Sequence, residues 1–228
     1  MPESAFVHEV TTESVADRVT SEIRRAILGG RLRPGQEFSL RTIAAQLGVS
    51  FIPVREALRS LEAEGLLMTR RGRSATVAPL DGDELRGICG LRQRVEPELA
   101  ARSGSAVDEA HLDLLRPRLE RCTDRALSPD ARYDEYHAIY FDLLRTSATD
   151  WEMRVTQMLA RAIERYVRAG RGEIDHSSQV PTELIVALRE LIAAAGTNDP
   201  EKIRATASDL VDLGARIAGE SLARVRQA

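Results

Sequence analysis

The sequence LRTIAAQLGVSFIPVREALRSLEAEG, residues 40–65, indicates two helices joined by a tight turn. Apolar residues on one face predict the first helix over residues 40–47. Ser39 can cap the start of this helix, and Gly48 can end it. Two short helices separated by so few residues favour a helix-turn-helix.

The second helix of this pair is expected to run from Phe51 to about residue 64, with Ser50 at its N-cap position. Phe51 and Ile52 are unusual, because they place two large apolar side chains where the helix begins. Either they belong to the core or they face a partner.

The flanking sequence adds a helix before this pair and a hairpin after it. Apolar residues every four positions predict a helix of about 14 residues from Ser14, and Pro34-Gly35 then forms a turn. The run LLMTRRGRSATVAP, residues 66–79, changes to a strand-like pattern around an Arg-Arg-Gly-Arg turn. These elements predict a winged helix-turn-helix at residues 10–80.

The remainder of the chain, residues 83–228, shows only helical patterns. Helices are expected at residues 82–103, 107–126, 131–146, 150–170, 180–196 and 199–226. The predicted fold is therefore mainly α, with an N-terminal winged helix-turn-helix followed by a C-terminal all-α helical bundle.

Composition excludes several classes of protein. The chain has 228 residues, of which 43% are hydrophobic, and no apolar run approaches the roughly 20 residues that span a bilayer. We therefore expect a cytoplasmic protein without a membrane partner. Two cysteines lack metal-ligand spacing, and no phosphate loop, nucleophile elbow or zinc-protease motif is found, so no enzyme is expected.

The charge is unevenly distributed, although the formal net charge is only -3. Between Arg41 and Arg73 there are six Arg and three Glu. A helix that enters the major groove needs short or polar residues in its first turn and Arg for phosphate or guanine, and Ser50 and Arg55 meet this need. The alternative is a plain three-helix unit whose Arg residues face solvent.

Residues 26–77 closely resemble the N-terminal domain of GntR-family transcriptional regulators, through the Pro-Gly turn, Leu-Gly-Val-Ser, Pro-Val-Arg-x-Ala-Leu and Glu-Gly-Leu. The resemblance implies that the DNA contacts are Arg41, Ser50, Phe51, Ile52, Arg55 and Gly72. The family usually has Arg-Thr where this chain has Phe51-Ile52. These two side chains either touch thymine methyl groups or pack on the wing or on a dimer partner.

The helical remainder resembles, less closely, the ligand-binding domain of the FadR-like branch of that family, an FCD-type domain near the shorter VanR-like form. The resemblance places Arg92 where an Arg reaches an effector carboxylate. The alternative for Arg92 is a solvent-facing salt bridge. Three Arg at positions 161, 165 and 168 are expected to form a solvated face.

Tyr133 and His137 fall on one face of the helix predicted at 131–146, together with Tyr140 and Leu144. A lone His on such a face is more often a hydrogen-bonded core residue than a ligand. The resembled domain often binds a divalent metal through an Asp and three His, but Tyr133 replaces the Asp and only His137 remains. We therefore expect no metal and no cofactor, with Arg92, Tyr133 and His137 binding an organic effector.

The sequence thus predicts a homodimeric regulator that binds a palindromic double-stranded DNA operator. The resemblance implies that it acts as a repressor and responds to a small anionic, carboxylate-type metabolite. Coupling between effector and DNA is expected to pass through the helix at 82–103. The alternative is a helical metabolite-binding or interaction protein whose winged domain has lost DNA affinity.

Overall fold

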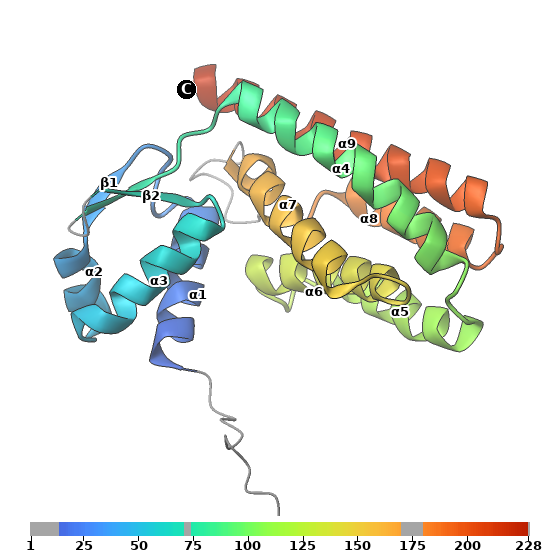
Figure 1. Ribbon diagram of the computed structural model, residues 1–228, viewed down its shortest axis with the longest axis horizontal. Coiled ribbons are helices and arrows are strands. Elements are labelled where there is room, and N and C mark those ends of the chain that lie inside the picture. Colours follow the sequence, from blue (N-terminus) through green and yellow to red (C-terminus); the bar gives the residue numbers. More distant parts are fainter. Residues whose placement is uncertain (1–13, 71–73, 170–179, 228) are drawn as a thin grey trace, which may run out of the picture.

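The computed structural model describes residues 14–70, 74–169 and 180–227. Within these ranges the chain forms nine helices and three strands. The helices and strands of the N-terminal part pack on one side of the molecule and the six remaining helices on the other (Figure 1). Each part has its own cluster of buried apolar side chains.

The N-terminal part is the predicted winged helix-turn-helix. Its elements are α1 (Val15–Leu28), β1 (Glu37–Ser39), α2 (Leu40–Leu47), α3 (Phe51–Ala63), β2 (Leu67–Arg70) and β3 (Ser74–Val77). The antiparallel sheet has the order β1-β3-β2, with Phe38 opposite Ala75. β1 was not predicted, because it has only three residues and its partner strand lies more than 30 residues further along the chain.

The turn between α2 and α3 follows from two local signals. The Ser39 hydroxyl accepts a hydrogen bond from the Thr42 amide at 3.0 Å, and Gly48 adopts a left-handed φ of 64° at the end of α2. Ser50 occupies the predicted N-cap position of α3 with an extended backbone, but its side chain makes no capping hydrogen bond. The position was therefore predicted correctly and the hydrogen bond was not.

The inner face of α3 holds the N-terminal part together. Val54, Ala57 and Leu61 have no exposed surface and pack beneath α1, which contributes Val19 and Ile23 to the same cluster. This arrangement fixes which side of α3 faces outward, because a helix that buries one stripe exposes the opposite stripe.

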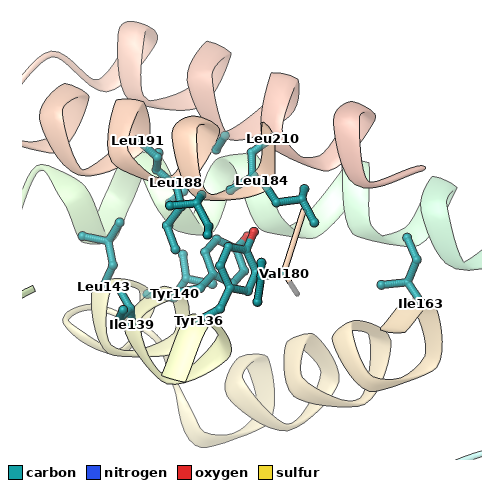
Figure 2. Close-up of a cluster of buried hydrophobic side chains, with 14 of the residues drawn as sticks. Tyr136, Ile139, Tyr140, Leu143, Ile163, Val180, Leu184, Leu188, Leu191 and Leu210 are labelled. Atoms are coloured by element: carbon teal, nitrogen blue, oxygen red, sulfur yellow. The ribbon is translucent and has the colours of Figure 1, made fainter. Parts of the chain in front are cut away.

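The six remaining helices are α4 (Gly82–Gly104), α5 (Glu109–Arg121), α6 (Pro129–Arg145), α7 (Asp150–Ala169), α8 (Thr182–Ala195) and α9 (Pro200–Gln227). Each of the six helices predicted from residue 82 onward is present. α4 and α9 lie side by side along most of their length (Figure 1). Side chains of α6, including Tyr136 and Ile139, face Leu184 and Leu188 of α8 in the core (Figure 2).

α7 connects the helical region to the winged part, and the expected solvated Arg face on this helix is wrong for two of its three residues. Arg165 is buried: its Nη1 donates to the Gly65 carbonyl at 3.2 Å, and its Nη2 pairs with Glu84 at the start of α4. Arg168 is also buried and pairs with Asp130 and Glu164. Only Arg161 is exposed, because partners from other elements cover the other two.

None of the helices within residues 14–70, 74–169 and 180–227 combines the length and the apolar character that a bilayer crossing requires.

Candidate nucleic-acid interface and effector cavity

The outward face of α3 begins with two apolar residues, Phe51 and Ile52. Phe51 is 52% exposed and Ile52 is 67% exposed, so neither belongs to the core. Arg55, four residues after Phe51 and three after Ile52, is exposed on the same face. The structure therefore brings Phe51, Ile52 and Arg55 together on one accessible surface, next to Ser50.

Two exposed arginines of the predicted interface have no acidic partner. Arg41 lies in the first turn of α2, and neither it nor Arg55 forms an ion pair with any carboxylate of the described ranges. By contrast, Arg24 on α1 is held by Glu64 through two hydrogen bonds of 2.6 and 3.0 Å. Guanidinium groups without a carboxylate are available for phosphate or guanine.

The sixth predicted DNA contact, Gly72, lies outside the described residues. The base of the hairpin is anchored to α3 by Glu62, whose Oε1 accepts hydrogen bonds from the Thr69 amide at 2.9 Å and from the Thr69 hydroxyl at 2.7 Å. These hydrogen bonds from Thr69 lower the pKa of Glu62. They fix the direction in which β2 leaves the end of α3.

A small cavity of about 40 Å³ lies inside the helical region. The three residues predicted to bind an effector all line it: Arg92 comes from α4, and Tyr133 and His137 come from α6. Glu164 of α7 and Gly214 of α9 also line the cavity. The sequence did not place these last two residues in the site, since they lie 72 and 122 residues beyond Arg92.

Arg92 does form a salt bridge, but the bridge is buried rather than solvent-facing. Its Nε and Nη2 donate to the two carboxylate oxygens of Glu96 at 2.7 and 2.8 Å, and Glu96 is fully buried. The Tyr140 hydroxyl donates to the same carboxylate at 2.7 Å. Burial alone lowers the pKa of Arg92, but the charge of Glu96 and its hydrogen bonds, together with smaller contributions from Tyr140 and Tyr136, place the pKa above its ordinary value.

The surroundings of His137 favour the neutral form of its imidazole ring. Burial lowers its pKa, and Glu164, whose Oε2 lies 3.6 Å from Nδ1, does not reverse the shift. The imidazole ring stacks on Phe141 with 5.8 Å between ring centroids. Around the cavity the charge of Arg92 is therefore balanced by Glu96, and the charge of Glu164 is balanced by Arg168.

In residues 14–70, 74–169 and 180–227, no three His, Cys, Asp or Glu side chains lie together as metal ligands. Tyr133 stands beside His137, and the nearest carboxylate, Glu164, is already held by Arg168. These residues do not fit a transition-metal site, which needs more nitrogen ligands than one imidazole.

Comparisons with known proteins agree with this architecture. The sequence model described as bacterial regulatory proteins, gntR family, matches residues 15–77. The HTH-type transcriptional regulator Mce2R of Mycobacterium tuberculosis is 28% identical over 90% of this chain and 91% of that protein. The regulator BphR of Paraburkholderia xenovorans is 27% identical, and the match covers 68% of this chain but slightly less than two thirds, 66%, of BphR.

The structure of E. coli McbR/YncC is similar over 92% of this chain and 99% of that chain, with a TM-score of 0.74 and 21% identity. At this identity the likeness establishes the fold. The two sequence relatives are named as transcriptional regulators and not as enzymes, in agreement with the expectation from the motifs.

Proposed function

We propose that this chain is a DNA-binding transcriptional regulator that binds a palindromic operator as a homodimer and represses transcription from it. The support is that residues 15–77 match the sequence model of bacterial regulatory proteins, gntR family, and that the described residues among them form a winged helix-turn-helix. In this proposal residues 10–80 bind DNA, and residues 83–228 form an FCD-type domain of the FadR-like branch that dimerises and binds an effector.

One observation carries the proposal for DNA binding: the second turn of α3 and the first turn of α2 expose Arg55 and Arg41 without carboxylate partners in the described ranges. Arg55 reaches a base edge or phosphate in the major groove, and Arg41 contacts the adjacent phosphate backbone. One such module covers few base pairs. A twofold pair on a palindrome doubles the contact, and this is the reason for proposing a dimer.

The cavity of about 40 Å³ has room for about three waters, since each needs roughly 10–15 Å³. A metabolite therefore enters only if α6, α7 and α9 move apart. A carboxylate on the effector has one evident partner, Arg92, whose Nε and Nη2 already donate to Glu96. The effector is thus proposed to be a small anion that binds the remaining N–H groups of this guanidinium or exchanges with Glu96.

α7 is the proposed route from the cavity to the DNA-binding part, in addition to the helix at 82–103 that the sequence suggested. Glu164 lines the cavity, and Arg165, the next residue, donates to the Gly65 carbonyl at the end of α3. Displacement of α7 by an effector changes how α3 is held. An effector shifts DNA affinity only if it binds the two arrangements differently, and this geometry supplies such a difference.

The experiment uses the full chain, a random duplex library and selection of bound DNA, followed by fluorescence anisotropy on the selected operator at several salt concentrations. We expect binding that weakens steeply with salt, and a loss of roughly 1–3 kcal/mol on Arg55→Ala. Arg145→Ala, an exposed arginine at the end of α6, is the matched control and should bind normally. Salt-insensitive binding, or no effect of Arg55→Ala, contradicts the proposal.

Effector binding is tested by thermal shift with a panel of small mono- and dicarboxylates. A binding anion should raise the melting temperature of the wild type and change its operator affinity, and Arg92→Met/Glu96→Gln should lose both responses. The second candidate, an interaction protein whose winged domain has lost DNA affinity, is favoured by the apolar pair Phe51 and Ile52 and predicts that no duplex is selected.

A further inference from the structure

Phe51 and Ile52 form an exposed apolar pair at the position from which a helix reaches into a groove. They are the first two residues of α3, and about half of Phe51 and two thirds of Ile52 are accessible. No packing role accounts for them, because the core of this part is made by the opposite face of α3. Their exposure therefore needs a different physical explanation.

We propose that Phe51 and Ile52 recognise thymine C5-methyl groups in the major groove of the operator. This inference rests on the proposed function and adds a sequence preference to it. Thymine is the base that presents an apolar group in the major groove, whereas the other base edges there offer donors and acceptors. An apolar side chain placed against those polar edges removes water from them without replacing its hydrogen bonds, which costs free energy. The pair therefore selects thymine by contact and disfavours the other bases by desolvation.

The position of Arg55 limits where these thymines lie. Arg55 is one helical turn beyond Phe51 on the same face, which corresponds to a rise of about 6 Å along the helix. Base pairs are spaced by about 3.4 Å, so the thymine and the base or phosphate contacted by Arg55 are separated by roughly two base pairs. Each half-site should accordingly contain a thymine at a fixed short distance from its Arg55 contact.

Charge complementarity favours DNA over a protein partner at this surface. Ile52 also borders a shallow hollow with Val15 and Pro53 at the start of α1, but Phe51 is not part of its lining. A protein seated over both apolar residues would also cover Arg55 and approach Arg41, two cations without carboxylate partners in the described part of the chain. A polyanion with apolar methyl groups satisfies both features.

The test compares the selected operator with the same duplex in which every thymine is replaced by uracil. This replacement removes the C5-methyl group and keeps all hydrogen-bonding groups and phosphates. Burial of one methyl group corresponds to about a fourfold change in affinity, so one contact in each half-site predicts that the full-length wild type binds the uracil duplex about 16-fold more weakly.

The double variant Phe51→Ser/Ile52→Ser should bind both duplexes equally, and each single variant should have an intermediate ratio. Leu114→Thr, which shortens an apolar residue that is 68% exposed on α5, should keep the wild-type ratio. Equal binding of both duplexes by the wild type overturns the inference, and so does a wild-type ratio in the double variant. If no duplex is selected at all, the proposed function fails and the inference fails with it.

Discussion

Replacement of Arg92 by Met should strongly destabilise the helical region, because it leaves a buried carboxylate without its cation. The Arg92 side chain is 10% exposed and that of Glu96 is fully buried, and two hydrogen bonds of 2.7 and 2.8 Å join them. Removing one partner of such a pair typically costs about 3–5 kcal/mol, most of which is the penalty for the uncompensated charge.

The companion variant Arg92→Met/Glu96→Gln removes both charges and keeps an oxygen that accepts from the Tyr140 hydroxyl. We expect it to recover roughly 2 kcal/mol or more of the loss, since no charge stays buried. The control is Arg94→Met, an exposed neighbour on the same helix, which should change stability by less than about 0.5 kcal/mol.

Urea unfolding followed by tryptophan fluorescence measures these differences, because the single tryptophan, Trp151, lies in α7 of the same region. If Arg92→Met is as mild as Arg94→Met, then Arg92 is not held in a buried pair. An effector carboxylate would in that case find the guanidinium free and would not have to displace Glu96.

Three further outcomes are expected. Leu61→Ala should cost about 2–5 kcal/mol in the winged part and lower the temperature at which operator binding is lost, because Leu61 has no exposed surface. Thr69→Val should reduce stability to urea at pH 7 but not at pH 3. The hydrogen bonds from Thr69 lower the pKa of Glu62 below its unfolded value near 4.5, so they stabilise the folded state at pH values above 4.5, and this stabilisation disappears as the carboxylate is protonated at lower pH. Cys122 should resist iodoacetamide at pH 8 until the chain is unfolded, as mass spectrometry can show, because burial raises its pKa to about 11.

The fold was largely predictable because its signals are local. Helix caps, the left-handed Gly48 and the spacing of apolar residues depend on neighbours within about four positions, and the predicted helices follow them. β1 was not predicted because its only buried residue, Phe38, is buried through pairing with Ala75 on a strand distant in the sequence. A strand of three residues that pairs with a distant strand is too short to show an alternating apolar pattern in the sequence.

The sequence predicted which residues lie around the cavity better than it predicted how those residues are paired. The placement of Arg92, Tyr133 and His137 around one cavity came from a family resemblance, and the helical spacing of the last two supports it. Their electrostatic state did not follow, because the pairing of Arg92 with Glu96 and the proximity of Glu164 to His137 depend on which faces of three helices meet.

The sequence by itself determined the winged helix-turn-helix, the helical remainder and the unusual pair Phe51-Ile52, since each is encoded by residues close together in the chain. Only the tertiary structure decided that Arg165 and Arg168 are buried and that the apolar pair is exposed. The same side chain is solvated or buried according to what packs over it, and for Arg165 that partner is Gly65, 100 residues away. Burial is a property of packed elements, and no local pattern contains it.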